Sequence, residues 1–91
     1  MICYRLRITG RVQGVAYRDW MVRAARAAGA VGWVRNRADG SVEALVAGPP
    51  DVVDALITSC RLGPPAARVD NVERSEEQSP DLSDFVMRRS D

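Results

Sequence analysis

Apolar and polar side chains alternate over the first nine residues of the chain. Apolar side chains occupy every second position from residue 2 to residue 8. They are Ile2, Tyr4, Leu6 and Ile8. Because successive side chains of a β-strand point to opposite faces, this period of two indicates a strand with one buried face. We therefore predict a first strand over residues 2–9.

The hydrophobic period changes at Arg18, after a loop over residues 10–17. From there to residue 28, apolar side chains recur at the spacing of one helical face. They are Met21, Ala24, Ala25 and Ala28. Alanine favours a helix, and Gly29 is a typical residue for ending one. The pattern predicts a helix over residues 18–28.

Two strands joined by a tight turn are predicted next. Residues 31–36 and 41–47 are rich in apolar and β-branched side chains. Between them, residues 37–40 end in Asp39-Gly40, a dipeptide typical of hairpin turns. We expect the two strands to pair as a β-hairpin.

A second helical pattern follows a break at residues 48–50, which read Gly-Pro-Pro. Asp51 is the expected N-cap, because a carboxylate can accept hydrogen bonds from the first turn. The apolar face consists of Val53, Leu56, Ile57 and Cys60. A second Gly-Pro-Pro, at residues 63–65, ends this helix.

The last third of the chain predicts two further strands. Residues 68–77 are polar and fit an edge strand, residues 79–81 fit a turn, and residues 85–88 fit a short final strand. The order is β-α-β-β-α-β with one added strand, which is typical of the ferredoxin-like α+β sandwich. We expect a single domain over residues 1–91, with both helices on one face of an antiparallel sheet.

Composition excludes several classes of function. The net charge of +1 provides no general field for nucleic acid. No apolar run approaches the roughly 20 residues that span a bilayer, and the N-terminus lacks the pattern of a signal peptide. We therefore expect a cytoplasmic protein, a monomer, without nucleic-acid or membrane partners. Cys3 and Cys60 are expected to be free, buried thiols.

The sequence contains no histidine. This excludes Ser–His and Cys–His nucleophile pairs and histidine metal sites, and it removes the usual general base at neutral pH. We expect no metal and no cofactor. If the chain is an enzyme, positioning and electrostatics must supply most of its catalysis.

The loop before the first predicted helix fits an anion cradle. Gly14 can adopt a positive φ, and Arg18 lies near a helix N-terminus that already carries about half a positive charge. Two positive groups at one place favour an anion between them. The spacing from Val12 to Arg18 matches cradles in which the first residue is a nucleophilic cysteine, so valine there excludes a covalent route. From the loop alone, a plain connection with a solvated Arg18 is also open.

Asn36 ends the second predicted strand. An asparagine at this position commonly serves a turn. Its carboxamide can also accept and donate hydrogen bonds, which suits the orientation of a water molecule. In the predicted strand order, Asn36 can lie near the loop before the first helix.

Three stretches resemble the acylphosphatase family. Residues 10–18 (GRVQGVAYR) are similar to its first signature, residues 32–43 with Gly48 to its second, and residues 63–69 to its link into the fourth strand. The resemblance covers nearly the whole chain. It implies a ferredoxin-like fold and metal-free hydrolysis of acyl phosphates to a carboxylate and inorganic phosphate.

The resemblance also implies roles for individual residues. Arg18 matches the phosphate-binding arginine, and Asn36 matches the asparagine that orients the attacking water. The phosphate-binding loop corresponds to Val12, Gln13, Gly14, Val15, Ala16 and Tyr17. Two positions depart from the common pattern. Tyr17 stands where many members have Phe, so its hydroxyl needs a partner or solvent, and Arg37 stands where many have a threonine that helps to hold the asparagine.

Two other functions are compatible with the predicted order of elements. An RNA-binding ferredoxin-like domain needs exposed aromatic side chains on its middle strands, and residues 41–47 have none. The second alternative is an acylphosphatase-like module of a carbamoyl-transferring maturation enzyme. Both catalytic positions are filled and the chain holds one domain, so we expect a free-standing enzyme.

Overall fold

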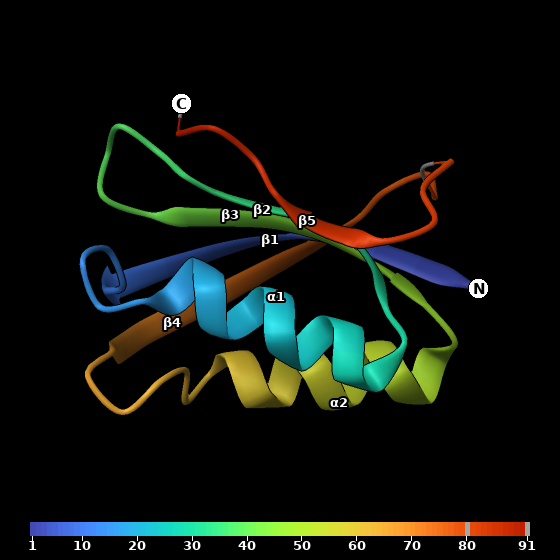
Figure 1. Ribbon diagram of the computed structural model, residues 1–91, viewed down its shortest axis with the longest axis horizontal. Helices are drawn as coiled ribbons and strands as arrows, with labels where there is room; N and C mark the ends of the chain where they lie inside the picture. Colours follow the sequence, from blue (N-terminus) through green and yellow to red (C-terminus); the bar gives the residue numbers. More distant parts are fainter. Residues whose placement is uncertain (80, 91) are drawn as a thin grey trace.

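The computed structural model describes residues 1–79 and 81–90, which form five strands and two helices. In chain order the elements are β1 (Ile2–Arg11), α1 (Tyr17–Ala28), β2 (Val31–Asn36), β3 (Val42–Gly48), α2 (Pro50–Cys60), β4 (Arg68–Glu76) and β5 (Phe85–Met87). Both helices lie on one face of the sheet (Figure 1). The predicted β-α-β-β-α-β order with an added strand is confirmed. The turn predicted at residues 79–81 includes Pro80, which lies outside the described residues. Among the helices described, none is long and apolar enough to cross a membrane.

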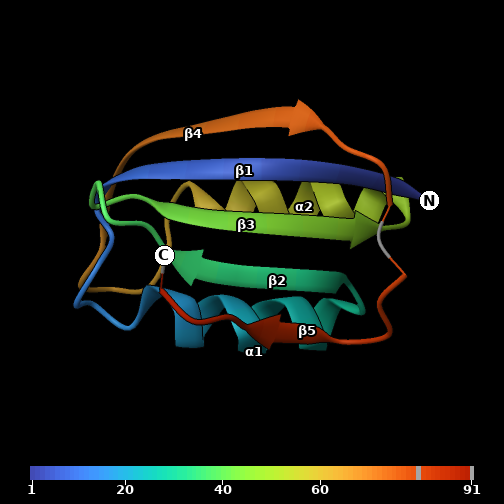
Figure 2. The ribbon, with the colours of Figure 1, turned by 90° about the horizontal axis from the view of Figure 1, so that it is seen from above.

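The sheet is mixed, whereas an antiparallel sheet was expected. Its strand order is β4-β1-β3-β2-β5. The four long strands pair antiparallel, but β5 pairs parallel to β2. The chain leaves β4 at the end of the molecule where β2 begins, so a strand that returns beside β2 must run in the same direction (Figure 2). The amide of Gly32 donates to Asp84 O at 3.0 Å, and the amide of Arg88 donates to Val34 O at 2.8 Å.

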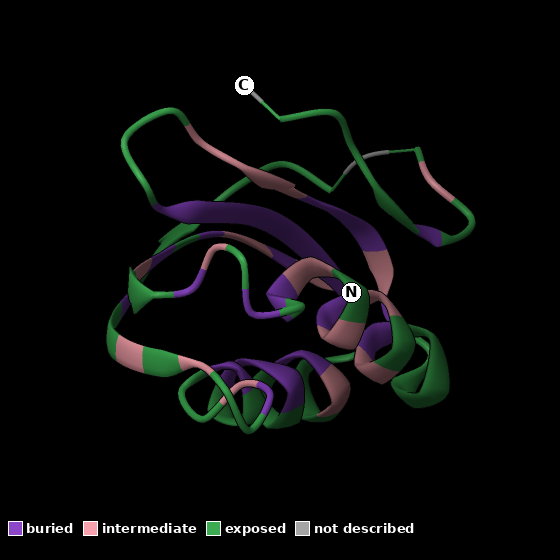
Figure 3. Ribbon diagram, turned by 60° about the vertical axis from the view of Figure 1, so that its left-hand side comes forward, coloured by how far each residue is buried: buried purple, intermediate pink, exposed green. Residues whose placement is uncertain are grey.

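The main core lies between the sheet and the helices, where most buried residues gather (Figure 3). All four apolar positions predicted on α2 are buried. On α1 the buried residues are Tyr17, Met21 and Ala25, which recur every four positions. The prediction for Ala28 is wrong, because that residue lies exposed in the last turn of α1, and Ala24 is only half-buried.

The start of α2 differs from the prediction. Asp51 is not the N-cap, because the N-cap lies two residues earlier, at Pro49, and Pro50 is the first residue of the helix. Proline fits there since its fixed φ is helical and the first amides of a helix have no partner within it. Asp51 lies in the first turn, where a negative charge interacts favourably with the helix dipole.

Both cysteines are free and buried, as predicted. Cys60 lies in the main core, and Cys3 packs on the opposite face of the sheet with Trp33, Leu45 and Ala47. Burial raises the pKa of Cys60 to about 12 and also raises the pKa of Cys3. Both thiols are therefore protonated at neutral pH and are poor nucleophiles.

An irregularity at the end of β1 directs the chain into the loop that precedes α1. The register between β1 and β4 shifts between Thr9 and Gly10. Gly10 has a φ of +119°, and a Cβ there would lie 2.2 Å from the carbonyl oxygen of Arg68. Only glycine permits this close approach of the two backbones.

Candidate active site

At one end of the molecule, the loop before α1 and the first turn of α1 lie beside the β2–β3 hairpin (Figure 2), and the last residue of β5 contributes to the same site. We call residues 12–16 the cradle loop. A cavity of about 130 Å³, the candidate pocket, lies among these segments. Its lining residues are Val12, Gly14, Ala16, Tyr17, Arg18, Asp19, Asn36 and Met87. The structure thus brings together Arg18, Asn36 and four of the six loop residues predicted from the sequence.

The backbone of the cradle loop is left-handed at two positions. Gly14 has a φ of +73°, and Ala16 has a φ of +63°. A left-handed alanine costs of order 1 kcal/mol, and such strain is concentrated at functional sites. Residues of alternating handedness turn consecutive N–H groups toward one side, which is the arrangement of backbone anion sites.

The N-terminus of α1 has no capping side chain. Ala16 is the N-cap residue, and the first helical hydrogen bond runs from Trp20 N to Ala16 O at 3.0 Å. The first amides of the helix therefore have no intrahelical partner, and no side chain of the described residues caps them. Together with the helix dipole, they favour an anion at this position.

Arg18 is the second residue of α1, as the sequence predicted to within one position. Among the residues that the structure describes, Arg18 forms no ion pair, and its one side-chain hydrogen bond is from Nη1 to Ser90 Oγ at 3.5 Å. Many other arginines of the chain pair with acids, for example Arg7 and Arg35. The guanidinium of Arg18 therefore offers most of its donors to an anion.

Asn36 places an acceptor without a partner at the pocket. Its Oδ1 atom is buried and has no hydrogen bond within the described part of the chain. A buried acceptor left unsatisfied costs about 1–3 kcal/mol, so such atoms are rare outside functional sites. A water molecule that donates to this oxygen would remove the cost.

Gln13 does not line the pocket but ties the cradle loop to the hairpin. Its Nε2 atom donates to Arg37 O at 2.7 Å and to Ser41 O at 2.8 Å. Ser41 O also accepts the amide of Arg37 at 2.8 Å. Because Arg37 follows Asn36 directly, Gln13 fixes the distance between the loop and the strand end that carries Asn36.

Tyr17 belongs to α1 rather than to the loop, and its side chain lies in the core. The hydroxyl donates to the carbonyl oxygen of Cys60 at 2.6 Å, which provides the partner that a tyrosine needs at this position. Burial raises the pKa of Tyr17 far above its ordinary value, so the phenol stays neutral. Val15 is also buried and does not line the pocket.

Two residues of the pocket were missed in the sequence. Asp19 follows Arg18 and bonds to Arg23 at 2.8 Å, four residues further along α1. Met87 comes from β5. Asp19 lies one residue beyond the stretch 10–18 on which Arg18 was predicted, whereas Met87 required knowledge of where β5 lies in the sheet.

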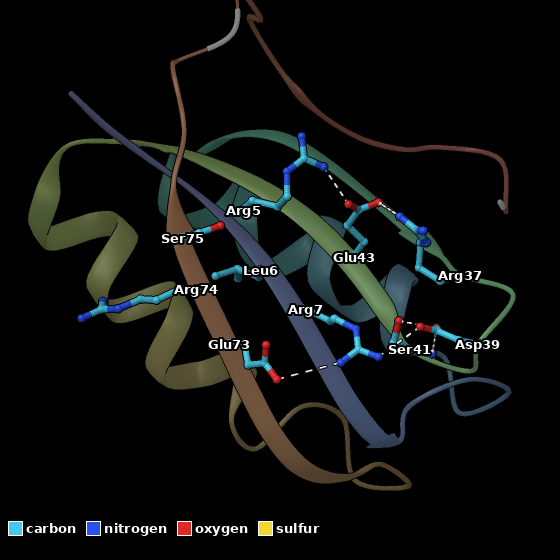
Figure 4. Close-up of a pocket in the computed structure, with 10 residues that line it drawn as sticks. All are labelled: Arg5, Leu6, Arg7, Arg37, Asp39, Ser41, Glu43, Glu73, Arg74 and Ser75. Atoms are coloured by element: carbon cyan, nitrogen blue, oxygen red, sulfur yellow. Dashed lines mark hydrogen bonds and ion pairs between the residues drawn. The ribbon is translucent and has the colours of Figure 1, made fainter.

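A larger cavity than the candidate pocket lies elsewhere, on the open face of the sheet. It has a volume of about 300 Å³ and is lined by charged side chains of β1, β3, β4 and the hairpin (Figure 4). Arg7 bonds to Asp39 at 3.1 Å and lies 3.9 Å from Glu73. Since these charges are paired within the protein, this cavity is less suited to an anion than the candidate pocket.

Glu43 is the centre of this network. Only 8% of the residue is exposed, and its carboxylate bonds to Arg5 at 2.6 Å, Arg35 at 2.7 Å and Arg37 at 3.1 Å. Burial alone would raise the pKa of Glu43, but the hydrogen bonds from the three arginines outweigh it and lower the pKa below its ordinary value. Arg37 thus binds Glu43 on the open face and does not line the candidate pocket.

A ferredoxin-like sandwich with an uncapped helix N-terminus and an arginine beside it defines a class of domain suited to small anions. The family model described as Acylphosphatase matches residues 4–87. The chain is 51% identical over 85 residues to the acylphosphatase of Rhodospirillum rubrum. The aligned segment covers 93% of each of the two proteins.

Solved structures give the same result. The acylphosphatase of Bacillus subtilis superposes with a TM-score of 0.91 at 33% sequence identity. The superposed region covers 96% of this chain and 98% of the Bacillus subtilis protein. HypF of T. kodakarensis superposes with a TM-score of 0.86 at 29% identity and covers 97% of this chain but 12% of HypF. The chain belongs to the acylphosphatase family. Members of this family are hydrolases that act on acid anhydrides, with an acyl phosphate as substrate and inorganic phosphate as product.

Proposed function

We propose that the chain 1–91 hydrolyses acyl phosphates without a metal ion and that Arg18 and Asn36 are its catalytic residues. The observation that carries the proposal is their shared pocket. In it, an arginine and a buried amide oxygen lie beside an uncapped helix N-terminus. Within residues 1–79 and 81–90, the arginine forms no ion pair and the amide oxygen accepts no hydrogen bond. The arginine and the amides of the helix N-terminus are the donors that a phosphoryl group needs. The amide oxygen is the acceptor that a water molecule needs.

The phosphoryl group is held by Arg18 and by backbone amides of residues 12–17. The planar guanidinium can bind two phosphoryl oxygens at once, and the amides at the start of α1 bind the others. Because these donors are in place before the substrate arrives, they stabilise the charge that the phosphoryl oxygens carry in the transition state.

The attacking water donates a hydrogen bond to Asn36. Its oxygen forms a bond to phosphorus while the bond between phosphorus and the acyl oxygen breaks, and the electron pair leaves with the carboxylate. The water proton moves to a phosphoryl oxygen, so the products are a carboxylate and inorganic phosphate. A carboxylate is a good leaving group, and the reaction therefore needs no histidine base.

The first test is the hydrolysis of benzoyl phosphate by the purified protein in excess EDTA, with inorganic phosphate as a competitive inhibitor. We expect Arg18→Ala to lose inhibition by phosphate and to reduce kcat/KM by at least about 10²–10³-fold, since charged hydrogen bonds contribute about 1.5–3 kcal/mol each. We expect Asn36→Ala to keep the phosphate inhibition constant and to lose turnover. Near wild-type turnover in Asn36→Ala, or loss of activity in EDTA, contradicts the proposal.

A second candidate function comes from the similarity to HypF, in which the matching segment is a small part of a larger protein. It is a module that acts as part of a larger protein. Steady hydrolysis of benzoyl phosphate by the isolated chain favours the free-standing enzyme. We further expect the protein to act as a monomer in the cytoplasm, a reducing compartment in which buried thiols such as Cys3 and Cys60 stay free.

A further inference from the structure

The candidate pocket has an apolar side that binding of the phosphoryl group does not use. Among the described residues that line the pocket, Met87 is the one large apolar side chain that is substantially exposed, at 45%. The other large apolar side chains that line it, Val12 and Tyr17, are fully buried and belong to the core. Met87 is thus placed to contact a ligand, whereas the other two hold the loop.

The position of Met87 follows from the pairing of β5. Met87 lies beside Val34 of β2, two residues before Asn36. It shares the helix-facing side of β5 with Phe85, which is completely buried in the main core. Because β5 runs parallel to β2, Met87 lies nearer than Phe85 to the end of β2 that carries Asn36. The side chain of Met87 therefore lies beyond the core and lines the pocket.

The charge beside Met87 is also informative. Asp19 lines the same pocket and contributes a carboxylate within one residue of Arg18. Its partner Arg23 offsets part of this charge, but both side chains are more than half exposed. A substrate whose acyl group carries its own negative charge would meet repulsion there, whereas a neutral acyl group would not.

We propose that the acyl side of the pocket selects neutral, apolar acyl groups, with Met87 as the contact and Asp19 as the charge that disfavours anionic ones. This inference rests on the proposed hydrolysis of acyl phosphates and names the substrate class for that same site. Methionine suits such a contact because its flexible thioether adapts to acyl groups of different shape and packs well against an aromatic ring. It follows that a benzoyl group is preferred over an acetyl group and over a carboxylated benzoyl group.

The test compares kcat/KM for three substrates: benzoyl phosphate, acetyl phosphate and 4-carboxybenzoyl phosphate. We expect Met87→Ala to lower the ratio of benzoyl to acetyl phosphate by about five- to tenfold, because roughly 40–60 Å² of apolar contact is lost. We expect Asp19→Asn to raise the ratio of 4-carboxybenzoyl to benzoyl phosphate about threefold. Inhibition by inorganic phosphate, which has no acyl group, should be unchanged in Met87→Ala.

Val86→Ala is the matched control. Val86 is the neighbouring residue on β5 and is exposed to a similar extent, 38%, but it lies on the opposite face beside Trp33. It should leave both ratios unchanged. If the wild type hydrolyses benzoyl phosphate and the ratios are the same in folded Met87→Ala and Asp19→Asn, the inference is wrong and the proposed function stands. If the wild type hydrolyses none of the three substrates, the proposed function fails and the inference fails with it.

Discussion

At the scale of single residues, two buried polar groups of this protein differ in how far their hydrogen bonds are satisfied. The carboxylate of Glu43 receives hydrogen bonds from three arginines. The Oδ1 atom of Asn36 receives none within the described residues, and Arg18 lacks an ion pair there. Because unsatisfied groups cost stability, their presence in one pocket is better explained by binding than by folding.

Tyr17 shows a polar group that serves the fold alone. Its hydroxyl donates to the carbonyl oxygen of Cys60, in the last turn of α2, at 2.6 Å. We predict that Tyr17→Phe lowers the free energy of unfolding by about 1–2 kcal/mol, since the buried carbonyl of Cys60 loses a donor. Urea unfolding measures the change, and kcat/KM for benzoyl phosphate should stay within about twofold.

Tyr4→Phe is the control for this prediction. Tyr4 is half-buried and its ring lies 5.0 Å from the guanidinium of Arg74, a contact that phenylalanine keeps. Its removal of a hydroxyl should change stability by less than about 0.5 kcal/mol. Equal effects of the two substitutions would show that the bond from Tyr17 to Cys60 contributes nothing.

At the scale of elements, the site depends on the fixed position of the cradle loop against the β2–β3 hairpin. The two segments are far apart in sequence, and the side chain of Gln13 joins them through two carbonyl oxygens. The same hairpin is closed on its other side by Asp39, which accepts hydrogen bonds from the amide and hydroxyl of Ser41. Gln13 is therefore a positioning residue that acts through the loop and through the residue after Asn36.

We predict that Gln13→Glu raises KM and lowers kcat together, with a combined loss in kcat/KM of about tenfold or more. The substitution keeps the length of the side chain but replaces the donor with a carboxylate that faces two carbonyl oxygens, so hydrogen bonds worth about 1 kcal/mol each become repulsive. Gln78→Glu, at an exposed position, is the control for the added charge. If KM and kcat are unchanged in folded Gln13→Glu, the loop holds its place without this link.

The sequence was sufficient for elements whose pattern is local. The period of two in β1 and the spacing of Val53 to Cys60 on α2 predicted both elements to within two residues at their ends, because each reflects contact with one core. Arg18 and Asn36 lie at a helix start and a strand end, as predicted, because the borders of these two elements also follow from local patterns. The strand β5 was predicted, but its partner was not, since three residues carry no information on which edge they join. Met87 was missed as a consequence.

At the scale of the whole molecule, the two faces of the sheet differ in what packs on them. The helix face contains the main core and ends in the candidate pocket, while the open face contains Trp33, with Arg5, Arg35 and Arg88 over its ring, and the ion pairs of Glu43. These ion pairs link β1, β2, β3 and the hairpin. We infer that they keep the strand ends in register at the site, which makes the stability of the fold dependent on pH.

The pKa of Glu43 sets the direction of that dependence. Because the folded-state pKa lies below its ordinary value of 4.5, the ionised carboxylate stabilises the fold above that pH, and the contribution is lost as the pH falls through the folded-state pKa. We predict that Glu43→Gln lowers the free energy of unfolding by about 1–3 kcal/mol at pH 7, since three arginines lose a charged acceptor. The loss of stability in Glu43→Gln should shrink steadily below pH 4.5.

Urea unfolding from pH 7 to pH 3 measures this loss. Glu73→Gln is the control, because Glu73 lies exposed, 3.9 Å from Arg7, and should contribute little to the free energy of unfolding. A deficit that is constant with pH would assign the loss to packing instead of charge.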